Sequence, residues 1–219
     1  MSTVALTIDD RPVQAAEGQT ILQAASHEGI QIPNMCSHPS LEPFGACRLC
    51  LVEITKGDRT RIVASCGYPV EEGLVVRTQT PHVRKLRALI LEIMMAMAPG
   101  VKSIRDLAHE YGVTRSRFAS DRTYCILCGL CVRYCEAAKD RPAIGFVGRG
   151  VNRRIAWVPE SSYEDCAKCG ECTSLCPTGV FPSNFALGID QQPAITAPVE
   201  TIELPDHVKN KLSSRGHRT

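Results

Sequence analysis

The sequence predicts an α+β protein that consists of two cysteine-rich domains, a helical linker between them and an extended C-terminal tail. Three observations lead to this prediction. Apolar residues alternate with polar ones near the N-terminus, a cysteine-free stretch after residue 80 repeats apolar residues at helical spacing, and twelve cysteines form three sets of four. The 219 residues, of which 44% are hydrophobic and 22% charged, suffice for two or three small domains.

Residues 1–79 are predicted to form the first domain, which begins with a hairpin. Alternating apolar residues at positions 4–8 indicate a half-buried strand, Asp9-Asp10 a turn, and residues 12–15 the returning strand. Thr20 is a favourable N-cap for the short helix that follows.

That helix is expected to end at Gly29, because glycine readily takes the left-handed conformation found at helix C-termini. A cysteine loop, a strand at residues 51–54 and a strand near residues 74–76 come next. A hairpin, a helix across the sheet, a metal-binding loop and further strands are the element order of a β-grasp domain. We therefore predict a β-grasp fold for residues 1–79.

Residues 80–119 are predicted to form a helical linker. Thr80-Pro81 starts its first helix with a cap and a first-turn proline, and Pro99-Gly100 ends it. Ser103 and Asp106 resemble the capping box of a second helix. Charged residues interrupt the apolar ones, and no stretch approaches the roughly 18 apolar residues that span a bilayer.

Residues 120–180 contain the pattern C-x2-C-x2-C-x3-C twice, at Cys125, Cys128, Cys131 and Cys135 and again at Cys166, Cys169, Cys172 and Cys176. This double run is the ligand set of a two-cluster ferredoxin, in which the fourth thiolate of each run binds the other cluster. We therefore predict one [4Fe–4S] cluster held by Cys125, Cys128, Cys131 and Cys176, and a second held by Cys166, Cys169, Cys172 and Cys135. The alternative is that each run is self-contained.

Thirty residues separate the two runs, and residues 146–147 and 155–158 within them are predicted to form a hairpin around the turn at 148–150. Residues 181–219 form the predicted extended tail, because periodicity is lost, prolines recur and the end is basic. Such an arm orders only against a partner, or does not order.

The remaining cysteines follow the pattern C-x10-C-x2-C-x15-C and are predicted to hold a [2Fe–2S] cluster through Cys36, Cys47, Cys50 and Cys66. His38 raises an alternative, because Cys36-Ser37-His38 matches the first half of a Rieske motif. The second half would need C-x2-H, whereas the chain has C-x2-C at that point. An all-cysteine site is therefore favoured, and His38 is interpreted as a loop residue or a hydrogen-bond donor near the site.

A disulfide scaffold and structural zinc are alternative explanations for so many cysteines. Disulfide-dense proteins are normally short and secreted, whereas this chain has 219 residues and starts with neither a basic nor an apolar segment. Zinc sites usually combine two C-x2-C pairs and have no need of the three-then-one spacing that occurs twice here. We therefore expect a cytoplasmic iron–sulfur protein, and the formal net charge of +2 gives no indication of a nucleic-acid partner.

Sites closed by four cysteines leave no iron position for a substrate, so electron transfer is the expected role. The chain has no complete dinucleotide fingerprint, P-loop or nucleophile elbow, and flavin and NAD(P) are expected only on partner chains. No catalytic residue is predicted. Arg48, Arg133 and Lys168 lie among the ligands and either tune the cluster potentials or belong to a solvated face.

The C-x10-C-x2-C-x15-C pattern comes first in the chain, a helical linker follows, and the two C-x2-C-x2-C-x3-C runs come last. This order resembles the iron–sulfur (diaphorase) subunit of NAD-reducing hydrogenases. The order is similar also to the N-terminal part of the large iron–sulfur subunit of complex I and of iron-only hydrogenases. The resemblance covers residues 1–180. It implies a hetero-oligomer in which the chain carries electrons between a flavin-containing, NADH-binding subunit and a catalytic oxidoreductase subunit. Such relatives commonly bind one more cluster through H-x3-C-x2-C-x5-C, but residues 81–124 contain no cysteine, so that cluster is expected to be absent.

We therefore predict an electron-transfer subunit of a multi-subunit NAD(P)H-linked oxidoreductase, with a hydrogenase, a formate dehydrogenase or an electron-bifurcating reductase as its catalytic partner. A free-standing ferredoxin that shuttles between enzymes is the alternative. The linker and the tail argue against a shuttle, because they hold no cluster. Three methionines in the linker form either a docking surface or helical core: Met94, Met95 and Met97. A truncated catalytic hydrogenase is excluded, because no cysteine remains for an active-site cluster.

Overall fold

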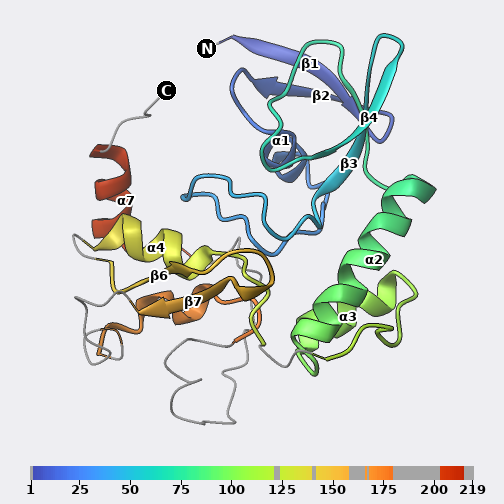
Figure 1. Cartoon of the computed structure of the whole chain (residues 1–219). Helices are drawn as coiled ribbons and strands as arrows, with labels where there is room; N and C mark the ends of the chain where they lie inside the picture. The colour runs from blue at the N-terminus through green and yellow to red at the C-terminus, as the bar shows by residue number, and fades with distance from the viewer. Residues whose placement is uncertain are drawn as a thin grey trace. The chain divides into compact units, whose positions relative to one another are not determined.

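The computed structural model describes residues 2–120, 124–139, 142–157, 166, 168–179 and 203–214. The chain divides into two compact units (Figure 1). The first unit comprises Met1–Met35 and Pro43–Ile126, and the second comprises Cys36–Glu42 and Leu127–Thr219. Helices and strands occur in both units, which confirms the predicted α+β class.

A five-stranded mixed sheet forms the body of the first unit, in the order β2-β1-β5-β3-β4. Its strands are β1 (Thr3–Ile8), β2 (Arg11–Ala16), β3 (Leu51–Lys56), β4 (Arg59–Ala64) and β5 (Val75–Arg77). The central strand, β5, is parallel to β1, and all other neighbouring strands are antiparallel. Every strand of this sheet except β4 was predicted from the sequence.

The predicted N-terminal hairpin is confirmed, with Leu6 opposite Val13 in the pairing of β1 and β2. Asp9 and Asp10 form its turn with φ angles of 47° and 63°. Two consecutive positive φ angles match the right-handed twist of the flanking strands, and Asp is one of the few residue types that adopts them at low cost. The turn therefore sets the register that directs Leu6 and Ile8 into the core.

Helix α1 (Ile21–His27) begins where the sequence predicted. The hydroxyl of Thr20 accepts a hydrogen bond from the backbone N–H of Gln23 at 3.2 Å, and the Gln23 side chain accepts one from the N–H of Thr20 at 2.8 Å. This reciprocal capping box satisfies backbone donors that the first helical turn leaves open. Gly29 follows the helix with a φ of 68°, as predicted.

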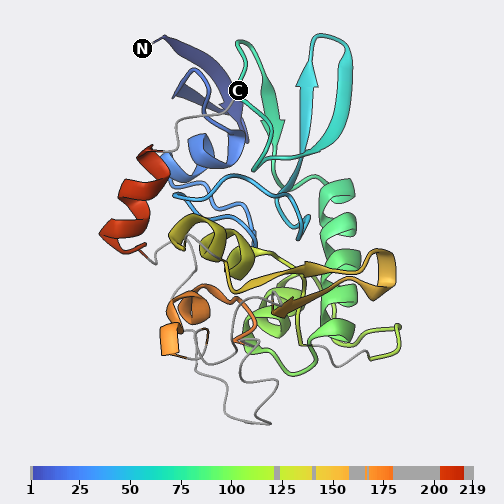
Figure 2. The ribbon, with the colours of Figure 1, turned by 60° about the vertical axis from the view of Figure 1, so that its left-hand side comes forward.

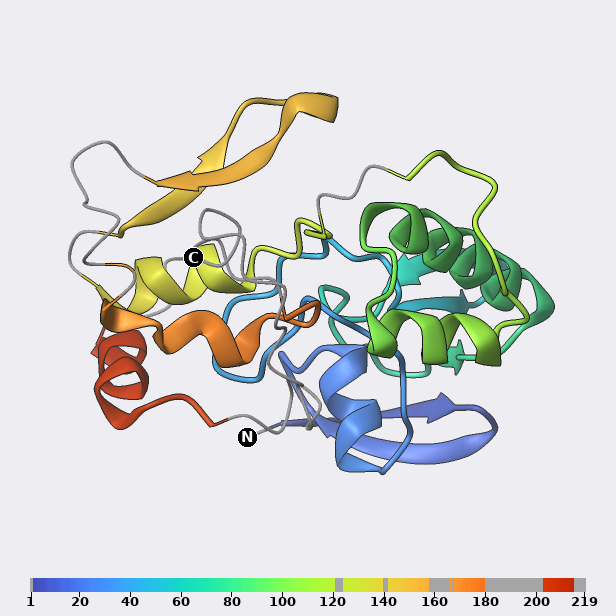
Figure 3. The ribbon, with the colours of Figure 1, turned by 90° about the horizontal axis from the view of Figure 1, so that it is seen from below.

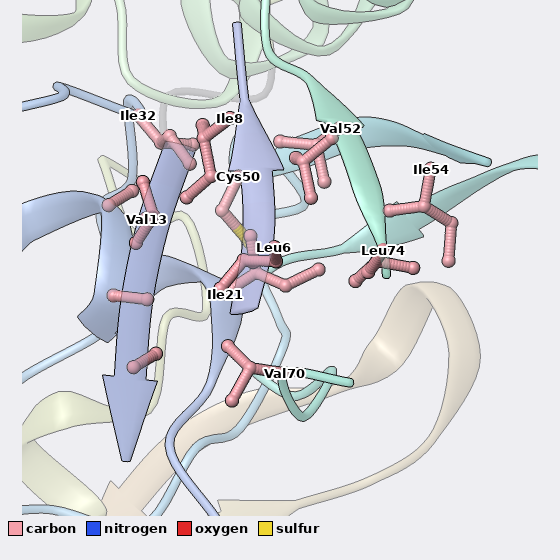
Figure 4. Packing of buried hydrophobic residues seen from close by; sticks show 14 of the residues in the cluster. Leu6, Ile8, Val13, Ile21, Ile32, Cys50, Val52, Ile54, Val70 and Leu74 are labelled. Atoms are coloured by element: carbon pink, nitrogen blue, oxygen red, sulfur yellow. The ribbon is translucent and has the colours of Figure 1, made fainter. Parts of the chain in front are cut away.

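The core of the first unit lies between the sheet and α1 (Figure 4). Fully buried members include Ile8, Ile21, Val52, Leu74 and Val76. Each such side chain stabilises the fold by about 2 kcal/mol through removal of apolar surface from water. Cys50 and Cys66 are packed into the same cluster, so the cysteine loop is anchored on an apolar core.

Helices α2 (Pro81–Met97) and α3 (Lys102–Glu110) belong to the first unit and pack against each other (Figure 3). The predicted cap of α2 is confirmed, since the hydroxyl of Thr80 accepts a hydrogen bond from the N–H of Val83 at 3.3 Å. The predicted capping box of the second helix is wrong. Its N-cap is Val101, without a side-chain hydrogen bond, and Ser103 already lies inside the helix.

Met94 is buried in the helical packing, which agrees with the core interpretation for this methionine. Within the described part of the chain, no helix combines the length and the apolar character needed to cross a bilayer.

The second unit contains helix α4 (Leu130–Ala138), the hairpin strands β6 (Ile144–Val147) and β7 (Arg154–Trp157), and helix α7 (Asp206–Ser214). Short 3-10 segments lie at η1 (Gly150–Asn152) and η2 (Glu171–Leu175). The predicted hairpin is confirmed by the antiparallel pairing of β6 and β7, while Val158 lies outside the described residues. Segment η2 packs against α4 (Figure 3).

The prediction of an extended tail is wrong for residues 206–214, because they form α7, which packs against α4 (Figures 1 and 2). Leu204 and Val208 are buried, with exposed fractions of 3% and 0%. Leu204, just before the helix, and Val208 within it are thus buried, although the recurring prolines gave no sign of ordered structure here. Residues 181–202 and 215–219 of the predicted tail lie outside the described residues.

Candidate iron–sulfur sites

All twelve cysteines lie in the described parts of the chain, and all are free thiols. Nine are buried, two are half-buried and only Cys169 is exposed. The disulfide alternative is therefore wrong. Among the described residues, no three Cys, His, Asp or Glu side chains converge closely enough to hold a single metal ion.

Cysteines of both predicted runs line one cavity in the second unit. The cavity has a volume of about 110 Å³, and four cysteines contribute to its wall: Cys135, Cys166, Cys169 and Cys172. Cys135 comes from α4 and the other three from the segment that ends in η2. The fourth cysteine of the first run thus lies with the first three of the second run, as expected for crossed ligation.

Burial controls the protonation of the thiols around this cavity. It raises the pKa of Cys166, and it raises that of Cys172 more strongly, with further contributions from the neighbouring Cys166, Cys135 and Cys169. Cys135 accepts a hydrogen bond from the backbone N–H of Ala143, with 3.2 Å between nitrogen and sulfur. Thiols in such a site stay protonated until metal binds, so metal loading must release protons.

A hydrogen-bonded network centred on Glu171 borders the cavity. The Tyr134 hydroxyl donates to Glu171 at 2.9 Å and Lys139 donates to the same carboxylate at 3.0 Å. Burial alone would raise the pKa of Glu171, but the bonds from Lys139 and Tyr134 outweigh it and lower the pKa below its usual range. None of these three residues was predicted from the sequence, because only the fold brings α4 and η2 together.

The cysteines of the other predicted [4Fe–4S] site are divided between the two units, with Cys125 in the first and Cys128, Cys131 and Cys176 in the second. Cys128 and Cys131 are buried, and the Cys176 sulfur lies 3.3 Å from the hydroxyl oxygen of Thr178. Cys131 belongs to α4 and Cys176 directly follows η2, the elements that also border the cavity.

Left-handed backbone conformations recur beside the predicted ligands. Gly129 and Gly170 have φ angles of 74° and 55°, and they initiate α4 and η2 at equivalent positions of the two runs. Three residues with side chains also have positive φ, namely Tyr124 at 52°, Leu127 at 53° and Arg48 at 58°. A non-glycine residue with positive φ destabilises the backbone by about 1–3 kcal/mol, and such residues cluster at functional sites. The cysteine loops are therefore held in strained backbone conformations.

The predicted [2Fe–2S] loop is buried in the first unit. Cys47, Cys50 and Cys66 have exposed fractions of 3%, 0% and 3%. The backbone N–H of Met35 donates to the Cys47 sulfur at 3.4 Å. Cys36 follows Met35 in the chain and is assigned to the second unit.

His38 lies in the loop Cys36–Glu42 of the second unit and is 3% exposed. Its Nδ1 accepts a hydrogen bond from the backbone N–H of Ser40 at 3.2 Å. This contact agrees with its interpretation as a loop residue.

Arg133 contacts the same loop, because its guanidinium donates to the carbonyl oxygens of Cys36 at 2.5 Å and of Glu42 at 2.6 Å. Arg133 is half-buried, and these two bonds join α4 to the backbone of a predicted ligand.

Comparison with known proteins identifies two iron–sulfur regions in the sequence. Residues 1–81 match the model of a 2Fe-2S iron-sulfur cluster binding domain, and residues 124–180 match that of a 4Fe-4S dicluster domain. A chain in the crystal structure of an NAD+-reducing [NiFe]-hydrogenase in the H2-reduced state superposes with a TM-score of 0.65. It is 30% identical, and the match covers 73% of this chain and 76% of that one. The chain belongs to the same family of iron–sulfur proteins as this hydrogenase chain.

Curated relatives of this iron–sulfur subunit are larger proteins. One subunit of the NADH-quinone oxidoreductase of Rhizobium meliloti is 31% identical over 91% of the chain, and the mitochondrial NADH-ubiquinone oxidoreductase 78 kDa subunit of Neurospora crassa is 32% identical over 82%. The 75 kDa subunit of NADH-ubiquinone oxidoreductase from Reclinomonas americana is 33% identical over 80%. The chain spans only 26%, 27% and 29% of these three relatives.

The residues of this iron–sulfur subunit fit the clusters that the matched domains bind. Four thiols around one cavity can ligate a cluster, and the backbone N–H directed at one of them can tune it. Glycines in the left-handed conformation start α4 and η2 beside these thiols. Buried cysteines packed on an apolar core likewise provide the water-excluded donor set of a [2Fe–2S] site.

Proposed function

We propose that the chain relays electrons between a flavin-containing, NAD(P)H-oxidising partner and a separate catalytic subunit of a hetero-oligomeric oxidoreductase. The relatives that support this proposal are subunits of NADH-quinone oxidoreductases and a chain of an NAD+-reducing hydrogenase. The terminal enzyme would be a hydrogenase, a formate dehydrogenase or an electron-bifurcating reductase. A β-grasp fold for the N-terminal domain is part of the proposal, and the mixed sheet, in which β1 and β5 pair in parallel, supports it.

The proposed cofactors are one [2Fe–2S] and two [4Fe–4S] clusters. Their proposed ligands are Cys36, Cys47, Cys50 and Cys66 for the first, Cys125, Cys128, Cys131 and Cys176 for the second, and Cys166, Cys169, Cys172 and Cys135 for the third. The observation that carries the crossed assignment of the third set is the cavity lined by Cys135 together with Cys166, Cys169 and Cys172.

Bound clusters supply one-electron redox chemistry, and the chain controls their surroundings. Burial of the thiols excludes water, and the N–H groups of Met35 and Ala143 direct positive dipoles at sulfur. Lys139 and Arg133 add positive charge close to predicted ligands. Each of these dipoles and charges stabilises the more negative, reduced state of a nearby cluster and so raises its potential.

The proposal predicts about ten irons per chain, from two in one cluster and four in each of the others. Metal and acid-labile sulfide analysis of anaerobically purified protein tests this number. About three zincs per chain with little iron, as expected for four thiolates per zinc, would overturn the cluster assignment.

Purification of the complex from its native source under anaerobic conditions tests the relay. Copurification with flavin-containing subunits is expected. A fully loaded, monodisperse monomer from the same extract would instead favour the free-standing ferredoxin. The cytoplasmic location expected from the sequence stays a prediction, and cell fractionation tests it.

A further inference from the structure

A charged side chain without any exposed surface lies beside the predicted [2Fe–2S] loop. Arg87 is on α2, and its exposed fraction is 0%. Its Nε donates to the carbonyl oxygen of Leu49 at 2.9 Å, and its Nη2 donates to that of Leu51 at 2.6 Å. Its Nη1 donates to the hydroxyl of Tyr111 at 2.9 Å. All these contacts lie within the first unit.

The two carbonyl groups bracket a predicted ligand, because Leu49 and Leu51 are the neighbours of Cys50 in the chain. Cys50 is itself 0% exposed. A guanidinium that bonds the residues before and after Cys50 fixes the backbone on both sides of the thiol. The planar fork of arginine donates to both carbonyls at once, which the single ammonium of lysine cannot reproduce in the same geometry.

The charge of Arg87 has no acidic partner among the residues that the structure describes. Its three hydrogen-bond partners are two carbonyl groups and a phenol. Glu92, further along α2, instead pairs with Arg117 at 2.7 Å. A buried charge without an opposite charge is costly, even where its hydrogen bonds are satisfied. The position therefore favours a negatively charged group nearby, and a cluster held by four thiolates is such a group.

We propose that Arg87 is a positioning residue of the [2Fe–2S] centre, which holds the Cys50 backbone and acts as the buried counter-charge of the cluster. This inference rests on the proposed ligand assignment. A purely structural role, in which Arg87 only ties α2 to β3, predicts lost stability without a change in potential. The counter-charge role predicts that loss of the charge makes reduction of this centre, and of no other, less favourable.

The test compares Arg87→Gln with Arg87→Lys in the full chain, with the potential of each cluster measured by redox titration followed by EPR. Arg87→Gln should lower the equilibrium constant for reduction of the [2Fe–2S] centre at least tenfold, which corresponds to a drop in potential of about 59 mV for one electron. Arg87→Lys keeps the charge, so its potential should stay within about threefold of wild type. Its EPR line shape and the amide exchange of residues 49–51 should still change, because the fork is lost.

Tyr111→Phe is the matched control, because it removes one hydrogen bond of Arg87 but neither the charge nor the bonds to Leu49 and Leu51. It should leave the [2Fe–2S] potential unchanged, and the [4Fe–4S] potentials should stay constant in every variant. Equal [2Fe–2S] potentials in wild type, Arg87→Gln and Arg87→Lys would overturn the proposal. The proposal would also fail if the potential of Arg87→Lys were as low as that of Arg87→Gln, or if Tyr111→Phe shifted the potential as much as Arg87→Gln does.

If the Arg87→Gln protein does not bind a [2Fe–2S] cluster, the Arg87→Lys protein tests the proposal. A loaded Lys variant with altered line shape and near-wild-type potential supports the proposal, whereas loss of the centre in both variants contradicts a role for the charge. Failure of the ligand assignment gives a different result, because wild-type protein would then show no [2Fe–2S] signal or, with His38 as a ligand, the higher potential of a His-ligated centre.

Discussion

The two units bury their cysteines in different ways. In the first unit, strands and α1 enclose an apolar core, and Cys50 and Cys66 occupy its border. In the second unit, the described buried residues gather around α4, whose own buried face includes Cys131 and Cys135. The cavity beside α4 is lined by four thiols together with Tyr134 and Ile144. The first unit therefore has an apolar core apart from its metal site, whereas in the second unit we expect the clusters to fill the space between α4 and η2 and to supply part of the stability.

Removal of iron should have the largest effect and should separate the two units. We expect chelation under reducing conditions to abolish hydrogen-exchange protection in α4 and β6, because the empty thiol cavity loses the bonds that hold it. Protection of β1 and β5 should persist at a reduced level. Amide exchange measured by mass spectrometry on the whole chain checks this, and equal loss in both units would contradict the comparison.

Crossed ligation in the second unit should appear as a change in iron content. Cys135→Ser should disturb the cluster held by Cys166, Cys169 and Cys172, with a loss of up to about four of ten irons. Cys131→Ser is the matched variant on the same helix and should disturb the other [4Fe–4S] cluster. Mössbauer and EPR spectra distinguish the two losses. A Cys135→Ser protein that lacks only the cluster of Cys125 would refute the crossing.

The apolar core of the first unit should respond to truncation. Ile8→Ala should lower the free energy of unfolding of this unit by about 2–5 kcal/mol, because it leaves a cavity between the sheet and α1. Val151→Ala, at a fully exposed position in the second unit, serves as the control and should change stability little. Denaturant unfolding followed by circular dichroism measures both. A similar effect of the two variants would show that the core is not the main support of the first unit.

A smaller, pH-dependent contribution is expected from the ion pair between Glu92 and Arg117. The Arg117 side chain and backbone N–H hold the pKa of Glu92 below its usual value near 4.5. Because the folded pKa is lower than the unfolded one, this stabilisation is present above pH 4.5 and is lost as the pH falls through the folded pKa. Unfolding curves from about pH 7 to about pH 3 should therefore be less steeply pH-dependent in Glu92→Gln. An identical pH dependence in wild type and variant would contradict this role.

Local rules account for the features that the sequence predicts correctly. The Thr20 and Thr80 caps, the Asp9-Asp10 turn and the hairpin of β6 and β7 depend on residues close in sequence, and each is confirmed. Ligand spacing is local in the same sense, because consecutive thiolates of a C-x2-C-x2-C run reach one cluster from a single turn of chain.

Predictions failed where a local signal was ambiguous. Ser103 and Asp106 have the spacing of a capping box, yet α3 starts one residue before Ser103. The segment 206–214 lacks a long periodic pattern, yet it forms a helix that packs on α4, with Val208 and the preceding Leu204 buried.

The linear order of residues thus specified the cysteine patterns, the turns and most of the helices and strands, because these depend on spacings of a few residues. Folding added the contacts between distant segments. Arg87 meets the backbone around Cys50 from 36 to 38 residues away, and Arg133 meets the Cys36 carbonyl from 97 residues away. Such partners are brought together by packing of whole elements, and no pattern of neighbouring residues encodes which carbonyl a buried guanidinium will reach.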